Sequence, residues 1–138
     1  MFNNILVPTD LSEKSRKAMD IAVAISSKGN ETITLLHVIE AIEGDDEDFQ
    51  EFYEKLRKRA QREMDEIAAE YERGGLVIDK EIFIGKRVQE IVRFANDHEV
   101  DIIILSSHRI ENFETGEGWA TISYKVGILA QCPVMMVK

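Results

Sequence analysis

Short apolar runs alternate along the chain with stretches whose apolar residues recur at helical spacing. Five runs, at residues 5–7, 32–39, 77–84, 101–105 and 134–137, are rich in branched aliphatic residues and have the length of strands. Most of them lack regular polar alternation, which is typical of strands buried on both faces of a parallel sheet. The run at 77–84 alternates in part, as expected for a strand nearer the edge of a sheet.

Helical spacing fills the intervals between these runs. The first helix follows Ser12, which can cap its start, and is expected to end with Gly29 in the C′ position. Its apolar stripe consists of Ala18, Met19, Ala22, Val23 and Ile25. Further helices are expected at residues 49–73, 88–95 and 121–129, on the same periodicity. This alternation predicts a single α/β domain over residues 1–138, with a parallel sheet, right-handed crossovers and helices on both faces.

Composition narrows the classes of function. The chain has 138 residues, 44% of them hydrophobic and 31% charged, which is typical of a globular domain. Its formal charge of −9 argues against nonspecific nucleic-acid binding and against attachment to an anionic membrane surface. Cys132 is the only cysteine, so no intrachain disulfide is possible. With no signal-peptide pattern and no apolar run near the ~20 residues of a membrane span, a cytoplasmic location is expected.

The stretch after the fourth run is the candidate binding region. A buried strand ends there in Ser106 and Ser107, a loop follows, and a helix is expected to begin at Thr121. An open α/β sheet places a phosphate-binding loop at such a carboxyl end. Loops of that kind normally carry glycines, which let backbone N–H groups approach an anion, but Ser106, Arg109 and Ala120 stand here instead.

Five segments, in this order, resemble the universal stress protein family. They are Ile5-Leu-Val-Pro-Thr-Asp10 with Ser12, Leu35-Leu-His-Val38, Gly85 leading to Ile91, Asp101-Ile-Ile-Ile-Leu-Ser-Ser-His108, and Cys132-Pro-Val134. The resemblance implies a Rossmann-like, three-layer α/β fold. In that fold an open sheet of five mainly parallel strands has the order 3-2-1-4-5 and carries helices on both faces.

The resemblance also implies a stress-response role and a homodimer joined through the last strand. That strand comprises Val134, Met135, Met136 and Val137. An apolar edge strand has unpaired backbone groups and invites a partner, which favours the same interpretation.

The family has an ATP-binding branch and a branch without ATP binding. The ATP-binding branch carries the motif Gly-x-x-Gly, followed after nine residues by Gly-Ser or Gly-Thr. Ser106 and Arg109 match the first two glycines and Ala120-Thr121 the last pair, after ten residues at 110–119. By resemblance, the adenine and ribose side of the pocket would hold Pro8, Thr9, Asp10 and Val38. The altered phosphate loop would comprise Ser106, Ser107, His108, Arg109, Ala120, Thr121 and Ile122.

These substitutions have opposing physical consequences. A side chain at Ser106 or Arg109 takes space that a phosphate would use, and the loop carries three glutamates between 110 and 119. Arg109 could nevertheless grip a phosphate as a fork-shaped donor, and Thr121 and Ser123 near a helix N-terminus could bond an anion.

The leading interpretation is a non-catalytic stress-response regulator. It would act through dimerisation and unidentified protein partners, and its adenine-nucleotide pocket would be degenerate. The alternative is a switch that binds ATP, with magnesium, through Arg109 and Thr121. A slow nucleotide hydrolase ranks third, because the sequence has no Walker lysine, no paired carboxylates for a metal and no nucleophile–base set.

Several single residues have two interpretations. Asp10 either binds on the adenine and ribose side or orders the turn before the first helix. His37, His98 and His108 lack metal-ligand spacing, so structural roles and no metal site are expected. Cys132 is expected to be a small buried hydrophobe, and Trp119 to plug the pocket. The acidic segment 43–48 is expected to be a solvated loop, with a docking site as the alternative.

Overall fold

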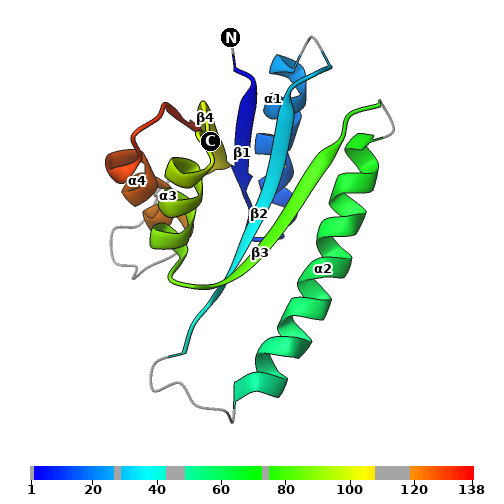
Figure 1. The fold of residues 1–138 in the computed structure, drawn as a ribbon, viewed down its shortest axis with the longest axis vertical. Helices are drawn as coiled ribbons and strands as arrows, with labels where there is room; N and C mark the ends of the chain where they lie inside the picture. The colour runs from blue at the N-terminus through cyan, green and yellow to red at the C-terminus, as the bar shows by residue number, and fades with distance from the viewer. Residues whose placement is uncertain (1, 27–28, 43–48, 73–74, 108–118) are drawn as a thin grey trace.

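A computed structural model of the chain describes residues 2–26, 29–42, 49–72, 75–107 and 119–138, with only the backbone described at residues 119 and 120. Strands and helices alternate along it, as the apolar pattern predicts (Figure 1). The elements are β1 (Asn4–Pro8), the 3₁₀ turn η1 (Glu13–Ser15), α1 (Arg16–Ile25), β2 (Thr32–Glu40), α2 (Gln50–Glu72), β3 (Ile78–Gly85), α3 (Arg87–Asp97), β4 (Ile102–Ser106), α4 (Trp119–Leu129) and β5 (Val134–Val137).

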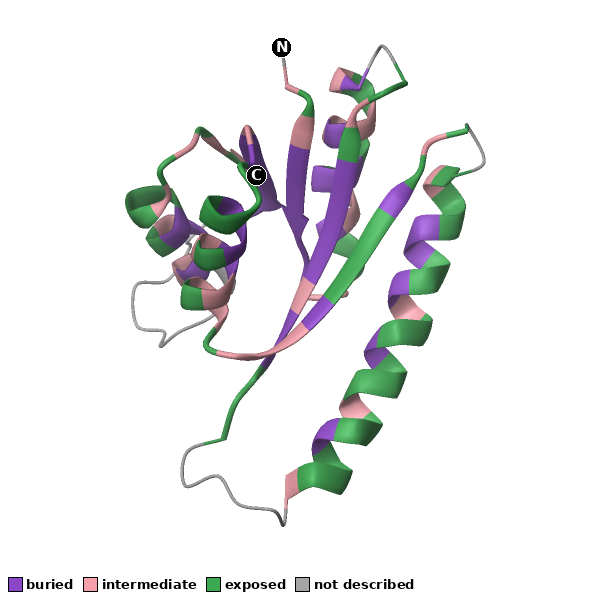
Figure 2. Cartoon of the chain, viewed as in Figure 1, coloured by how far each residue is buried: buried purple, intermediate pink, exposed green. Residues whose placement is uncertain are grey.

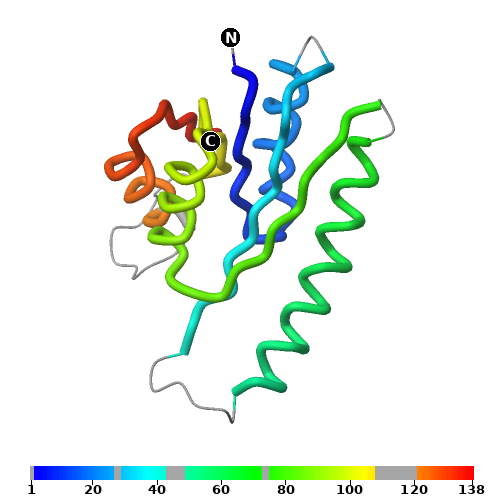
Figure 3. The backbone as a smooth tube through the Cα atoms, viewed as in Figure 1, coloured from blue at the N-terminus to red at the C-terminus, as the bar shows by residue number. Residues whose placement is uncertain are grey.

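The strands form a parallel sheet in the order β3-β2-β1-β4-β5, which confirms the expected order. β1 lies at its centre, where Ile5 is opposite Ile33 of β2 on one side and Ile102 of β4 on the other. The chain moves outward from β1 to β3 and then crosses to the other half of the sheet for β4 (Figure 3). All four strand pairings are parallel, so the carboxyl ends of the strands lie at the same end of the sheet.

Helices cover both faces of the sheet, and the side chains of each central strand divide between them. Ile5 and Val7 of β1 pack with the buried residues of α1 and α2, whereas Leu6 packs with those of α3 and α4. Leu35 and Leu36 of β2 divide in the same way. Both strands are therefore buried on both sides, which explains why their sequences lack polar alternation (Figure 2).

Predicted helix ends differ from the structure in α1 and α4, and α3 extends to Asp97, beyond the predicted residue 95. α1 ends at Ile25, because Ser26 closes the last turn: its hydroxyl donates to the Ala22 carbonyl at 2.7 Å. Gly29 instead adopts a φ of +76° shortly before β2. The Ser12 side chain makes no capping bond and donates to Asp10. α4 begins at Trp119, so Thr121 lies inside its first turn.

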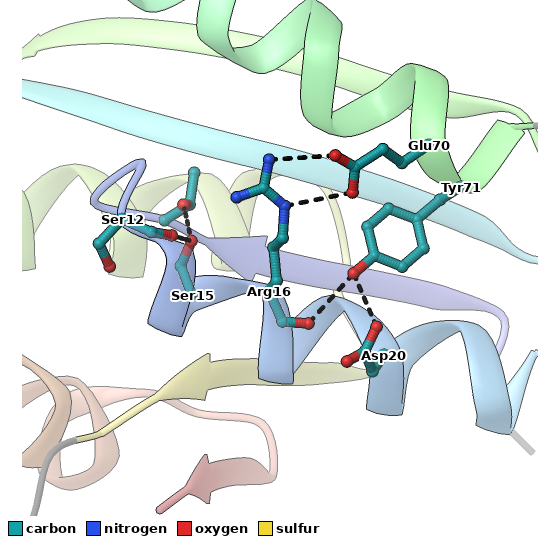
Figure 4. A network of polar contacts seen from close by, with 7 residues as sticks. Ser12, Ser15, Arg16, Asp20, Glu70 and Tyr71 are labelled. Atoms are coloured by element: carbon teal, nitrogen blue, oxygen red, sulfur yellow. Dashed lines mark hydrogen bonds and ion pairs between the residues drawn. The ribbon is translucent and has the colours of Figure 1, made fainter.

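A polar cluster joins α1 to the C-terminal end of α2 (Figure 4). Two guanidinium nitrogens of Arg16 each lie 3.2 Å from a carboxylate oxygen of Glu70. The Tyr71 hydroxyl donates to Asp20 Oδ1 at 2.7 Å and contacts the Arg16 carbonyl at 3.3 Å. Burial, followed by the bond to Asp20, raises the pKa of Tyr71 well above its usual value.

This raised pKa predicts a loss of stability in alkali. Unfolded tyrosine ionises near pH ~10, while folded Tyr71 keeps its proton to higher pH. Its contribution is therefore complete below pH ~10 and declines as the pH rises through the folded pKa. At pH 7 we expect Tyr71→Phe to lower the free energy of unfolding by about 1 kcal/mol, the usual net value of one hydrogen bond. Urea unfolding at pH 7 and pH 11 should show the difference between the two proteins shrinking. A constant difference would contradict this assignment.

Candidate functional site

A cavity of about 650 Å³ opens where the carboxyl ends of β1 and β2 face α2. Its wall is largely apolar and includes side chains from both the sheet and the helix. The apolar lining consists of Leu11, Val38, Ile39, Ala41, Ile42, Phe52, Leu56 and Ala60, and the polar lining of Asp10, Ser12, His37, Glu40, Arg59, Glu63 and Arg87. The cavity lies at the end of the sheet where open α/β folds bind ligands.

The turn between β1 and α1 forms one rim of this cavity. Leu11 has a φ of +68°, a left-handed conformation that a side-chain-bearing residue rarely adopts. The Leu11 N–H donates to Thr9 Oγ1 at 2.9 Å, and Thr9 Oγ1 donates to Ser15 Oγ at 2.8 Å. These bonds hold the strained turn, because Thr9 is buried and cannot exchange them for water.

Asp10 orders the same turn, which is one of its two expected roles. Its Oδ1 accepts hydrogen bonds from the Ser12 N–H at 3.0 Å and from the Ser12 hydroxyl at 2.6 Å. Asp10 also lines the cavity, together with Val38, so the structure brings these two predicted pocket residues together. The other two lie behind the wall: Pro8 is buried at the end of β1, and Thr9 is 1% exposed.

His37 stands in the cavity wall with a defined protonation pattern. Its Nδ1 lies 2.9 Å from the Thr9 carbonyl oxygen, which only accepts, so Nδ1 carries the proton. Burial lowers the pKa of His37 below its ordinary value; Arg87 lowers it further, while the bond to Thr9 and the nearby carboxylates of Asp10 and Glu63 oppose the shift. The ring is therefore neutral near pH 7 and presents Nε2 as an acceptor. The bond to Thr9 agrees with the structural role expected of His37, and the ring also lies in the cavity wall.

The charged side chains around the cavity form two ion pairs. Arg59 Nε lies 3.4 Å from Glu63 Oε1, and Arg87 Nε lies 3.4 Å from Glu40 Oε2. Both pairs are partly solvated, so each contributes little to stability. The two ion pairs matter more for ligand binding than for stability. Each arginine already has a carboxylate partner and is therefore less available to an anionic ligand.

The cavity residues of α2 and α3 could not be predicted as site residues from the sequence. Leu56, Ala60 and Glu63 follow one another at helical spacing, and that spacing alone indicates a core-facing helix. Only the position of α2 beside the end of β2 turns this face into a cavity wall.

Ser106, the first residue of the predicted phosphate loop, is directed toward α1. It is 4% exposed, and its Oγ donates to the Lys14 carbonyl at 2.8 Å and accepts from the Ala18 N–H at 3.3 Å. It thereby satisfies a free donor in the first turn of α1, as a capping side chain would. Its hydroxyl therefore faces the start of α1.

The other described residues of that loop are also engaged or lie elsewhere. Ser107 is 2% exposed, and its Oγ accepts from Ser123 Oγ at 2.9 Å, which joins the end of β4 to α4. Ile122 is buried and Thr121 is half-buried in the first turn of α4. None of these four lines the cavity, so the structure does not bring the two halves of the predicted pocket together there.

Other predictions for this region fall outside the described residues. They concern His108, Arg109, the side chains of Trp119 and Ala120, and the acidic segment 43–48.

β5 is an edge of the described sheet, as predicted. It pairs with β4 through Val134, Met135, Met136 and Val137, and no other described strand pairs with it. Met135 is 38% exposed. Among the described strands this edge is therefore paired on one side only, the arrangement to which a further strand can add.

The remaining candidates for chemistry have structural environments. His98 stacks on Phe94 with ring centroids 3.9 Å apart, and its Nδ1 donates to the Phe94 carbonyl at 3.1 Å. Cys132 is half-buried rather than fully buried, and burial raises the pKa of its thiol. Within the described ranges, no three His, Cys, Asp or Glu residues gather as metal ligands would. No helix in those ranges is both long and apolar enough to cross a membrane.

Comparison with known proteins gives the chain a family. The sequence profile of the universal stress protein family matches residues 1–138. Universal stress protein MJ0577 of Methanocaldococcus jannaschii is 31% identical over 132 residues, which cover 83% of this chain and 82% of that protein. The solved structure of MJ0577 superposes with a TM-score of 0.85 at 35% identity, covering 100% of this chain and 96% of that one.

Two more distant structures share the fold. Universal stress protein UspA from Lactobacillus plantarum has a TM-score of 0.81 at 22% identity, covering 99% of this chain and 98% of its own. A family protein from Arabidopsis thaliana, solved with AMP bound, has a TM-score of 0.69 at 18% identity, covering 99% and 91%. The profile match over the whole chain and the identity to MJ0577 agree with the order of motifs and of strands. This chain belongs to the universal stress protein family.

Proposed function

We propose that this chain is a non-catalytic stress-response regulator that acts through dimerisation and protein partners, with a degenerate phosphate side in its nucleotide pocket. The environment of Ser106 carries the proposal. An anion at a sheet–helix junction needs unpaired N–H groups, which glycines leave accessible. Here the Ser107 N–H is bonded to the Val137 carbonyl, the Ser106 hydroxyl to Lys14 and Ala18, and the Ser107 hydroxyl to Ser123.

The open edge at β5 supports the dimer. The Ile103 N–H donates to the Pro133 carbonyl at 3.0 Å, and the Ser107 N–H donates to the Val137 carbonyl at 2.7 Å. Backbone groups alternate in direction along a strand, so those of Val134 and Met136 face away from β4. A second copy related by a two-fold axis would satisfy them with its own β5.

A nucleotide switch is the second candidate, and two observations favour it. The Arabidopsis relative carries AMP on the same fold. Thr121 lies in the first turn of α4, where a helix N-terminus attracts anions. In this version Arg109 would supply the missing positive charge.

Calorimetric titration with magnesium and ATP separates the two functions. For the regulator we expect no binding at millimolar ATP, and no nucleotide released when freshly purified protein is denatured. Micromolar binding that Arg109→Ala weakens would overturn the degenerate pocket and establish the switch. ATP turnover abolished by Asp10→Asn or Thr121→Ala would instead establish a hydrolase.

A further inference from the structure

Another recess, of about 180 Å³, lies at the opposite end of the sheet from the cavity that α2 borders. It is found near the amino ends of β2 and β3, beside the C-terminal end of α3, and its lining includes Thr32, Thr34, Asp79, Glu81, Phe94 and His98. The volume is below the ~300–1,000 Å³ of pockets that enclose a whole drug-sized ligand. The recess therefore suits one compact chemical group.

Thr34 faces this recess with a hydroxyl that lacks a protein partner. Side chains alternate between the two faces of a strand, and the neighbouring Ile33 and Leu35 pack with α1 and α2, so Thr34 points to the α3 side. Thr34 is only 5% exposed, and no residue in the described ranges shares a hydrogen bond with its hydroxyl. A nearly buried hydroxyl without a partner costs free energy, so a ligand gains by bonding to it.

Two carboxylates on β3 stand beside this hydroxyl. Asp79 is the register partner of Thr34, and Glu81 follows two residues later on the same face of the strand. Both are exposed, in the middle of β3 between two buried residues (Figure 2). Neither has an ion-pair partner in the parts of the chain that the structure describes. Acidic residues are poor strand formers, so two of them on one face of β3 are placed there at a cost in stability.

The surroundings of the two carboxylates favour a cation. Among the described residues that line the recess there is no lysine or arginine. Lys80 lies between the two carboxylates in sequence but points to the other face, where its Nζ is 2.9 Å from Asp65 of α2. The end of α3 adds the negative pole of a helix dipole. The Nδ1–H of His98 is committed to the Phe94 carbonyl, so Nε2 of the neutral ring is an acceptor.

The arrangement of acceptors suits a flat cation with several donors. Acceptors from β2, β3 and α3 surround one small space, next to the stacked rings of Phe94 and His98. An ammonium group has three donors, whereas a guanidinium group has five in one plane and also stacks on aromatic rings.

We infer that this recess binds a guanidinium group, which donates to the carboxylates of Asp79 and Glu81 and to the hydroxyl of Thr34. The group can belong to a free guanidino compound or to an arginine side chain of a partner protein. The recess lies away from the nucleotide pocket and from β5, so the inference stands independently of the proposed function.

Three small probes test this chemistry by NMR titration of the full chain at pH 7.5 and low salt. Methylguanidinium has the charge and the planar donors, methylurea has a similar shape without the charge, and tetramethylammonium has the charge without donors. We expect methylguanidinium to shift the amide signals of Thr34, Asp79 and Glu81. The other two should bind at least about tenfold more weakly, which corresponds to about 1.4 kcal/mol. Equal binding of methylurea or of tetramethylammonium would overturn the inference, as would the absence of any shift with methylguanidinium at millimolar concentration.

Thr34→Val separates binding from folding. Valine keeps the branched shape and removes a hydroxyl that has no protein partner, so the melting temperature should stay the same or rise. Methylguanidinium should nevertheless bind several-fold more weakly. Undiminished binding by a folded Thr34→Val would overturn the role of the hydroxyl.

Asp79→Asn removes one negative charge from the recess and should weaken methylguanidinium about tenfold. Glu54→Gln is its matched control, because it removes the same charge from an exposed position on α2, which packs on the other face of the sheet. The control should bind as the native protein does. Equal losses in the two variants would show that overall charge, and not the recess, attracts the cation.

Two larger probes identify the source of the group. Agmatine represents a free guanidino compound, and N-acetylarginine methylamide represents an arginine within a protein chain. Tighter binding of agmatine would assign the recess to a small molecule, and tighter binding of the blocked arginine would assign it to a protein partner. Loss of either probe in Asp79→Asn would confirm that it occupies this recess.

Discussion

Replacing Leu35 with alanine is expected to lower the free energy of unfolding by about 3 to 5 kcal/mol. Leu35 has no exposed surface and packs with α1 and α2 in the larger of the two buried clusters. β2 is held by a strand on each side, so the backbone has little freedom to collapse into the space left behind. Urea unfolding followed by circular dichroism measures the change.

Leu129→Ala is the matched control for this substitution. The same atoms are removed from a residue that is 56% exposed on α4, so a change within about 0.5 kcal/mol is expected. Equal losses at the two positions would show that burial does not set the difference.

Met135→Glu is expected to convert a dimer to monomers at concentrations at least about 100-fold above the native dissociation constant. Met135 is 38% exposed on the open edge strand. A two-fold interface places the same patch of each copy against the other, so the two new carboxylates would face each other and repel. Sedimentation velocity over a concentration series measures the change, and the fold should remain, since this side chain is exposed in one copy.

Val77→Glu adds the same charge at the opposite edge of the sheet. Val77 precedes β3 and is 74% exposed, and its variant should remain as dimeric as the native protein. A native protein that is monomeric at high concentration would contradict the dimer itself. Dissociation by both variants would show that overall charge, and not β5, controls assembly.

The sheet could be predicted from sequence because its burial is extreme. Runs such as residues 5–7 face helices on both sides, and only a parallel sheet between two helical layers gives that environment to consecutive residues. Helix ends were harder to predict. Gly29 has the residue type of a C′ position, but the competing bonds of Ser26 end α1 earlier. A local preference is overridden wherever a neighbouring side chain satisfies the same backbone groups.

The candidate site was only half accessible to sequence reasoning. Asp10 follows β1 and Val38 lies near the end of the adjacent β2, so their meeting follows from the sheet order. Arg59 and Arg87 join them only because α2 and α3 start and cross where they do, and no spacing in the sequence records that. Ser106 shows a second limit. From the sequence, Ser106 is only a serine where the motif has a glycine. Its hydroxyl bonds to Lys14 and Ala18 at the start of a helix that lies about 90 positions away in the chain, and no local pattern indicates that contact.

The central position of β1 also determines the order in which the strands can pair while the chain is synthesised. Residues 4–85 contain β1, β2 and β3, so three of the five strands can pair while the remainder is still inside the ribosome. The other side of β1 waits for Ile102 and Ile103, and until they emerge it exposes a bare apolar edge in the middle of the future molecule. A nascent chain stalled before residue 101 is thus the form that most needs a chaperone.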